Sequence, residues 1–171
     1  MAFEILGDVE GFLSEIFSSL ASRGIDVSRF ELDHICYRVE TLEEYAEMNG
    51  KLSALGICLG EHQIGGRPIA TYKMREPIVF REREIFCVEL PSPKSSSPHP
   101  RGLEHAEFVI DESFESFMAK YPEVNFETKG MMKKHNPELE LEFGRLAVKF
   151  HSMALERVIQ NETETEKKAG K

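Results

Sequence analysis

The segments DHICYRVE at residues 33–40 and EHAEFVID at residues 104–111 decide the fold that this sequence predicts. Each begins with an acidic residue followed by a histidine, His34 in the first and His105 in the second. Each then alternates between apolar and polar side chains, which is typical of a β-strand with one buried face. So short a match is weak by itself, and it gains weight because the elements around it also repeat.

The order of predicted elements after each segment is the same, namely one helix and then three more strands. Thr41 suits the cap of the first helix, and the Gly65-Gly66 pair suits a tight hairpin turn. The sequence therefore predicts an α+β domain of two βαβββ repeats, at about 32–93 and 102–152. We expect helices at 42–55 and 112–120, and strands at 57–64, 68–74, 84–90, 124–128, 139–143 and 145–151.

Three further segments flank or connect these repeats. Apolar residues at helical spacing predict an amphipathic helix at 8–22, within an N-terminal extension at 1–31. The proline-rich run PSPKSSSPHPRG at 91–102 predicts an exposed connector. A closing helix at 153–160 completes the domain at 32–160. The tail NETETEKKAGK at 161–171 has almost no apolar residues, so we expect it to be disordered.

Composition limits the function. The formal net charge of −9 repels phosphate backbones, which argues against nucleic-acid binding. No stretch approaches the roughly 20 apolar residues of a membrane span, and no basic segment precedes an apolar run as in a signal peptide. The three cysteines form no CxxC pair, which favours reduced thiols. We expect a cytoplasmic protein, either monomer or homodimer, with a small-molecule ligand.

Four predicted strands carry ionisable side chains on one face and apolar side chains on the other. A solvent-exposed face explains any one of them, but such faces are usually rich in Thr, Lys, Glu and Ser. Histidine on three of the four strands favours a shared site on one concave face. The residues of these faces are His34, Cys36, Arg38, Cys87, Glu89, His105, Glu107, Lys149 and His151.

Imidazoles together with a carboxylate suit one divalent transition metal such as Zn²⁺, Ni²⁺, Co²⁺ or Fe²⁺. The predicted ligands are His34, Glu89, His105 and His151. The spacing is only moderately specific, since no HExxH or CxxC motif anchors them.

The repeat order and these motifs resemble the vicinal-oxygen-chelate superfamily, which includes glyoxalase I, extradiol dioxygenases, methylmalonyl-CoA epimerase and bleomycin-resistance proteins. HICYRV, VELP and EHAEFVID are similar to its metal-binding strands. DHICYR, GGRPIATYKMREP, VELPSP, LEHAEFVI and VKFH are similar to the bacterial YecM-like family, over roughly residues 32–160. The resemblance implies a curved mixed sheet around a central pocket and a metal site, without an established reaction.

One position departs from the superfamily pattern. Glyoxalases and dioxygenases place a carboxylate on the eighth strand, where this sequence has Lys149, two residues before His151. Either His151 serves as the fourth ligand or Lys149 fills the space and three ligands remain. The departure puts both known chemistries in doubt.

The remaining polar residues each have alternative roles. Glu107 is a candidate general base or a partner that orients an imidazole. Arg38 is a candidate clamp for a substrate carboxylate, or the salt-bridge partner of Glu89 or Glu107. Arg67 and Lys149 are candidate substrate-binding residues, although a hairpin arginine is often simply exposed. We interpret Cys36 and Cys87 as core residues, and His62, His99 and His135 as surface residues.

Four functions follow as hypotheses. The first is a metal-dependent isomerase or lyase acting on a small oxygenated metabolite, with Glu107 or a metal-bound water moving the proton. The second is a non-haem Fe(II) oxygenase with two histidines and one carboxylate. The third is a non-catalytic small-molecule binding protein, and the fourth is a purely structural histidine cluster.

Overall fold

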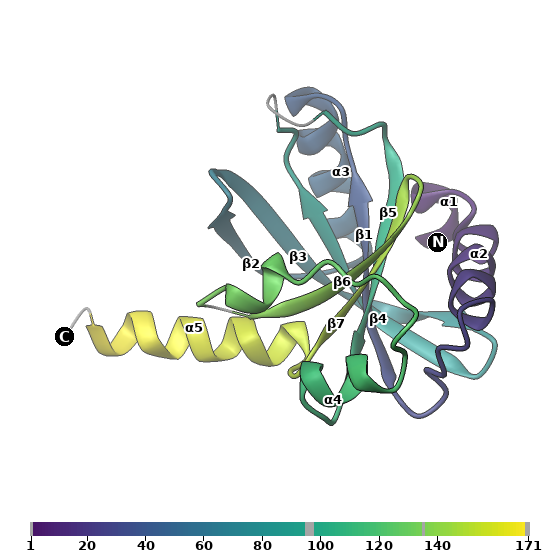
Figure 1. The fold of residues 1–171 in the computed structure, drawn as a ribbon. Helices are drawn as coiled ribbons and strands as arrows, with labels where there is room; N and C mark the ends of the chain where they lie inside the picture. Colours follow the sequence, from purple (N-terminus) through teal and green to yellow (C-terminus); the bar gives the residue numbers. More distant parts are fainter. Residues whose placement is uncertain (1, 95–97, 135, 170–171) are drawn as a thin grey trace.

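A single curved sheet organises the molecule (Figure 1), and the computed structural model describes residues 2–94, 98–134 and 136–169. Within these residues seven strands pair in the order β2-β3-β4-β1-β5-β7-β6. The strands are β1 (Glu31–Arg38), β2 (Gly56–Ile64), β3 (Arg67–Phe80), β4 (Arg83–Pro91), β5 (Gly102–Val109), β6 (Glu138–Phe143) and β7 (Leu146–His151). The helices are α1 (Ala2–Leu6), α2 (Val9–Ala21), α3 (Leu42–Leu55), α4 (Phe114–Ala119), the 3-10 helix η1 (Lys129–Met132) and α5 (Leu155–Ala169).

The two predicted repeats meet at the centre of this sheet. β1 pairs parallel with β4, and β5 pairs parallel with β7. β1 and β5, the two strands that open the repeats, pair antiparallel with each other. The mixed α+β sheet expected from the sequence is therefore confirmed, and its four central strands are the four that carry the candidate ligands.

The second repeat is one strand shorter than predicted. The segment at 124–128, expected to be a strand, contributes only an isolated bridge between Glu127 and Glu140. A turn bonds the Val124 amide to the Tyr121 carbonyl on one side, and η1 begins at Lys129 on the other. Too few extended residues remain between them for a ladder, so the prediction of eight strands was wrong in this place.

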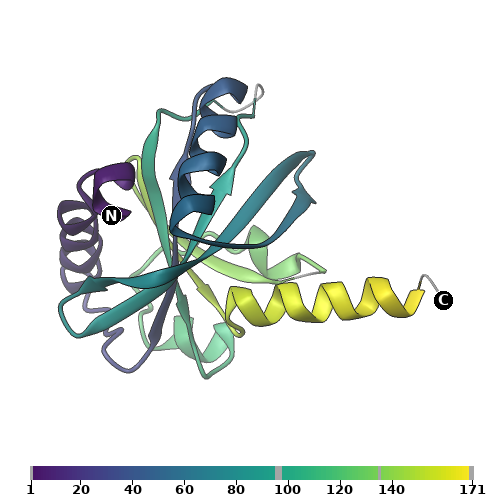
Figure 2. The same ribbon diagram turned by 180° about the vertical axis from the view of Figure 1, so that it is seen from behind.

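The apolar core lies between the helices and one face of the sheet. α3 is capped by the Thr41 hydroxyl, as the sequence predicted, and α2 is capped by the Asp8 side chain. α2 contacts β5 and β7, whereas α3 contacts β2, β3 and β4. Figure 2 shows the molecule from behind, with α2 at the left, α3 at the top and α5 projecting to the right. The alternate strand positions face the other way, and there they line the candidate site.

The C-terminal segment differs from its prediction. α5 continues to Ala169, so residues 161–169 form a helix instead of the disordered tail that we expected. Figure 1 shows this helix projecting from the sheet. Leu155 and Ile159, in the first turns of α5, are buried against the rest of the protein. The Glu, Lys and Ala residues that follow have high helix propensity, which explains why the helix continues beyond residue 160. No helix in the described part of the chain is long and apolar enough to cross a membrane.

Candidate metal centre

Two β-bulges at the centre of the sheet bring acidic side chains next to the two repeat histidines. In the β1–β5 ladder Leu32 pairs with Phe108 and His34 with Glu107, so Asp33 is an extra residue on β1. Glu104 is the corresponding extra residue on β5. A bulge changes which face the following side chains occupy. Each acid can therefore lie beside the histidine that follows it, although neighbours in a regular strand point to opposite faces.

The Nδ1 atom of each of the three strand histidines has an oxygen partner outside the cluster. His34 Nδ1 lies 2.6 Å from Asp33 Oδ2, and His105 Nδ1 lies 3.2 Å from Glu104 Oε2. His151 Nδ1 lies 3.1 Å from the Pro137 carbonyl. Carboxylate and carbonyl oxygens only accept, so these contacts favour a proton on Nδ1. In a neutral imidazole that leaves the Nε2 lone pair for a metal ion.

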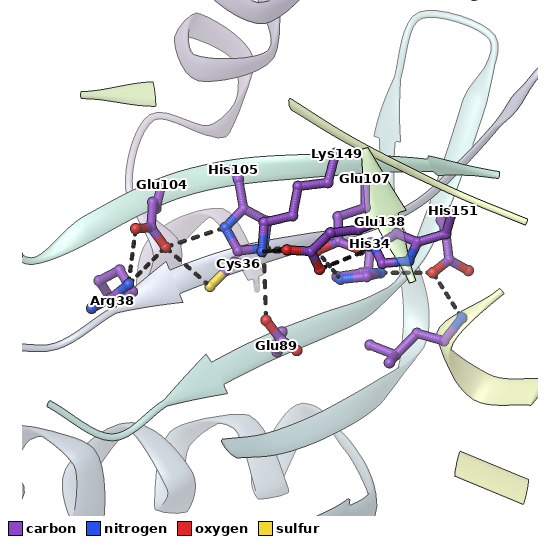
Figure 3. A network of polar contacts seen from close by, with 12 residues as sticks. His34, Cys36, Arg38, Glu89, Glu104, His105, Glu107, Glu138, Lys149 and His151 are labelled. Carbon is purple, nitrogen blue, oxygen red and sulfur yellow. Dashed lines mark hydrogen bonds and ion pairs between the residues drawn. The ribbon is translucent and has the colours of Figure 1, made fainter. Parts of the chain in front are cut away.

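The three Nε2 atoms face inward onto carboxylates (Figure 3). Glu107 Oε1 lies 3.3 Å from His34 Nε2 and 3.0 Å from His105 Nε2, and Glu107 Oε2 contacts His151 Nε2. Glu89 Oε2 lies 3.7 Å from His105 Nε2. All three Nε2 atoms are buried, and none has a partner in hydrogen-bond geometry among the described residues. Buried nitrogens of this kind are unusual and need a partner.

Four of these side chains form a set suited to one cation. One ligand atom from each of His34, Glu89, His105 and Glu107 lies within 4.8 Å of all the others. Two imidazoles and two carboxylates match borderline divalent transition metals, and the two negative charges balance one such ion. The residues present therefore fit a metal, by donor type and by their unpartnered buried nitrogens.

Three of the four predicted ligands belong to this set, and the fourth, His151, does not. The structure brings His34, Glu89 and His105 together, and Glu107 joins them in the position that we had expected of His151. His151 lies on the far side of Glu107, whose second oxygen it contacts. The sequence suggested Glu107 as a general base or an orienting partner, because one ligand was expected from each of the four strands. His105 and Glu107 in fact point to the same side of β5 and both reach the cluster.

The charges in the cluster stabilise one another. Burial by itself lowers the pKa of His34, but the charge of Glu107 and the contacts with Asp33 and Glu107 raise it to about 10. Burial raises the pKa of Glu107, but His34 and His151 hold it well below its usual range. Without a metal, protons on the imidazoles therefore balance the carboxylates.

Lys149 occupies the position of the missing eighth-strand carboxylate. Its Nζ lies 3.7 Å from Glu107 Oε1 and 3.7 Å from Glu138 Oε1, and its side chain is mostly buried. Burial lowers the pKa of this ammonium, but the charges of Glu107 and Glu138 outweigh burial and raise it. Lys149 therefore adds a fixed positive charge beside the candidate ligands.

The two candidate arginines line the same pocket of about 1160 Å³. Arg38 Nη1 donates to both oxygens of Glu104, at 2.8 and 2.9 Å. The predicted pairing of Arg38 with Glu89 or Glu107 was therefore wrong, because the bulge at Glu104 turns that nearer carboxylate toward it. Arg67 also faces the pocket, where its Nη1 donates to the Ser92 carbonyl at 2.8 Å.

Some polar groups around the site were missed or misread. The sequence did contain a signal for Asp33 and Glu104, because an acidic residue directly precedes the histidine in both repeat strands. Glu140 gave none, because it alternates along β6 with two other glutamates, Glu138 and Glu142. His62 and His99 are not simple surface histidines: His62 lines the pocket 3.7 Å from a carboxylate of α5, and His99 lies 3.5 Å from Glu104. His135 lies outside the described residues.

A mixed sheet that contains two parallel pairs, β1 with β4 and β5 with β7, has the fold of the vicinal-oxygen-chelate class. The family described as YecM protein matches residues 2–162, and the chain belongs to that family. Protein YecM of Escherichia coli (strain K12) is 25% identical over 177 residues, covering 93% of each chain. An uncharacterised protein of Haemophilus influenzae is 30% identical over 86 residues, covering 50% of this chain and 45% of its own.

Solved structures share the fold. The structural-genomics protein EC4020 superposes with a TM-score of 0.75 at 24% identity, covering 92% of this chain and 91% of its own. Methylmalonyl-CoA epimerase in complex with methylmalonyl-CoA superposes with a TM-score of 0.52 at 12% identity. That match covers 74% of this chain and 96% of the epimerase. At these identities the likeness concerns the fold alone.

Proposed function

We propose that this protein holds one divalent transition metal, Zn²⁺, Ni²⁺, Co²⁺ or Fe²⁺, and acts as an isomerase or lyase on a small oxygenated metabolite. One observation carries the proposal. The inward Nε2 atoms of His34 and His105 meet the carboxylates of Glu89 and Glu107 within 4.8 Å, while their Nδ1 atoms are tied to outer carboxylates. Outer partners of this kind orient metal-binding imidazoles and raise their basicity.

The comparison with methylmalonyl-CoA epimerase supports the proposal only as a shared fold, since one fold serves many reactions. The proposed reaction is therefore inferred from the residues of the site. A metal in this position would act as a Lewis acid on two neighbouring substrate oxygens and stabilise negative charge that develops on them. The protein's own residues have to bind the substrate, exclude water and move a proton.

Glu140 is the carboxyl that we propose for proton transfer. On the β6–β7 ladder it pairs with Lys149, which pairs in turn with Glu107 on β5. It lines the pocket, and its side chain has no hydrogen bond or ion pair within the described residues. Burial raises the pKa of Glu140 by more than the charge of Lys149 lowers it, and the charge of Glu138 raises it further. A carboxyl with a raised pKa in a pocket suits general acid–base work.

Glu107 is the alternative base, as the sequence suggested. It contacts three imidazoles and is nearly fully buried, so a ligand role fits it better than free proton transfer. Lys149 supports either arrangement, because its ammonium stabilises negative charge at this end of the pocket. His151 remains a candidate ligand only if Glu107 moves aside.

Hydrogen exchange tests this function. Metal-loaded protein would be incubated in D₂O with pyruvate, 2-oxobutyrate and acetoacetate, and NMR would follow deuterium entry beside each carbonyl. We expect faster exchange than with EDTA-treated protein, and about a 100-fold loss in Glu140→Gln with metal content unchanged. Glu142→Gln, at an exposed position two residues further along the same strand and outside the pocket lining, is the matched control. Equal exchange with and without metal on every probe would contradict the proposal.

A second candidate is the Fe(II) oxygenase. Two histidines and one carboxylate are the usual ligands of such iron, and His34, His105 and Glu89 or Glu107 supply them. Oxygen consumption by the Fe²⁺-loaded protein, absent from the Zn²⁺-loaded protein, would favour this reaction over isomerisation.

The setting of the protein is part of the same proposal. All three cysteines, Cys36, Cys58 and Cys87, are free, which supports a reducing compartment such as the cytoplasm. The ligand is a small molecule, and the active species is a monomer or a homodimer.

A further inference from the structure

Two arginines, Arg38 and Arg67, line the pocket. Figure 3 shows Arg38 beside Glu104, on the side of His105 away from His151. Arg38 is 7% exposed. Its Nη1 binds Glu104, but its Nε is buried and has no acceptor within the described residues. A buried donor without an acceptor is costly, and a ligand oxygen would relieve that cost.

Arg67 is the second arginine. It is partly buried at the start of β3, and its only acceptor in the described part of the chain is the Ser92 carbonyl. Burial lowers its pKa, and the positive charge of Arg38 lowers it further. Both guanidinium groups line the same pocket, and arginine side chains carry a positive charge in proteins.

Among the described residues Glu104 is the only carboxylate hydrogen-bonded to either arginine, so one of the two positive charges has no ion-pair partner. This surplus occurs in a chain whose net charge is −9. We propose that Arg38 and Arg67 form an anion subsite that holds the carboxylate of the substrate. A monoanionic carboxylate neutralises the surplus, whereas a phosphate dianion would exceed it. Guanidinium groups bind planar carboxylates with paired, charge-assisted hydrogen bonds.

The subsite rests on the proposed function for its place in catalysis, and it narrows the substrate class. Arg38 Nη1 and His105 Nδ1 contact the same oxygen, Glu104 Oε2, at 2.9 and 3.2 Å, so a single carboxylate separates the subsite from a candidate metal ligand. The carboxylate of the substrate therefore lies beside the metal site. The substrate is a small carboxylic acid whose oxygenated carbon is close to its carboxylate.

Butyrate and butyramide test the subsite, because they share a shape and differ in charge. Each would be titrated into EDTA-treated and Zn²⁺-loaded protein, with NMR of the arginine Nε–H signals as the readout. We expect butyrate to shift the Arg38 signal and butyramide to leave it unchanged. Arg67→Met should weaken butyrate binding at least tenfold, and Arg67→Lys should weaken it less. Arg75→Met, an exposed arginine on the same strand, should stay within twofold of wild type.

Three results would overturn the subsite: equal binding of butyrate and butyramide, an unchanged affinity in Arg67→Met, or inorganic phosphate binding tenfold tighter than butyrate. Arg38 is left unaltered, because it forms a buried ion pair whose loss endangers the fold. Binding of butyrate by the metal-free protein supports the subsite even if the metal proposal fails. Metal loading without butyrate binding refutes the subsite and leaves the metal proposal intact.

Discussion

Asp33→Asn tests whether the outer carboxylate organises the metal centre. Asp33 Oδ2 accepts from His34 Nδ1 at 2.6 Å and from the Leu155 amide at 2.9 Å, so one oxygen orients a candidate ligand and also anchors the start of α5. Asparagine keeps the size and an acceptor oxygen but removes the charge. The His34 imidazole then loses its charge-assisted hydrogen bond, which makes it a weaker and less well oriented ligand.

The expected loss can be stated for each measurement. Removing an outer partner of a metal-binding histidine costs about 10- to 100-fold in metal affinity, which is about 1.4–2.7 kcal/mol. Losing a hydrogen bond to a charged group costs the metal-free protein about 1.5–3 kcal/mol of folding free energy. Competition with a chelator would give the first value for Zn²⁺, and urea unfolding would give the second.

The control is Asp111→Asn, the same change at an exposed aspartate paired with Arg29. Its metal affinity should match wild type, and its stability should change by less than about 0.5 kcal/mol. A folded Asp33→Asn protein that binds Zn²⁺ as tightly as wild type would refute the reasoning, because Asp33 would then have no part in orienting the ligand.

Three further changes have expected outcomes. Apparent metal affinity should rise with pH, by up to about tenfold per pH unit for each proton displaced, because the metal-free site holds His34 protonated up to a pKa of about 10. Calorimetry in buffers of different ionisation enthalpy measures that proton release, and an affinity independent of pH would contradict it. Lys149→Met should increase metal affinity several-fold, since it removes a buried positive charge 3.7 Å from Glu107, and a chelator titration that finds weaker binding would count against the assignment. Phe150→Ala should cost about 3–5 kcal/mol in urea unfolding, because this fully buried ring packs on Phe108 at 6.1 Å, whereas exposed Phe86→Ala should cost far less; equal losses would contradict this packing.

The sequence predicted the fold well because the signals that it used are local. Alternation in 33–40 and 104–111, together with the same order of elements after each, gave the repeats and their central strands. Thr41 and the apolar spacing of 8–22 located two helices within a residue or two. The prediction of a strand at 124–128 was wrong because the preceding turn and the following helix η1 leave too few extended residues between them.

The site was harder to predict because it depends on bulges. A period-2 pattern puts Asp33 and Glu104 on the faces opposite their histidines, so nothing in the alternation assigned them to the site. The extra residue at each bulge changes that geometry, and register is a property of two paired strands that neither segment specifies alone. For the same reason the partner of Arg38 was predicted incorrectly, whereas His34, Glu89 and His105 were brought together as expected.

Metal content of the untagged protein tests the central claim most directly. Elemental analysis of wild type would stand beside His34→Ala and His105→Ala, with Asp111→Asn at an exposed position as the control and circular dichroism as the check on folding. The account predicts close to one equivalent of Zn, Ni, Co or Fe in wild type and in the control, lost in both ligand variants while the fold survives. A wild-type protein that holds none of these metals, even after incubation with each ion, would contradict it.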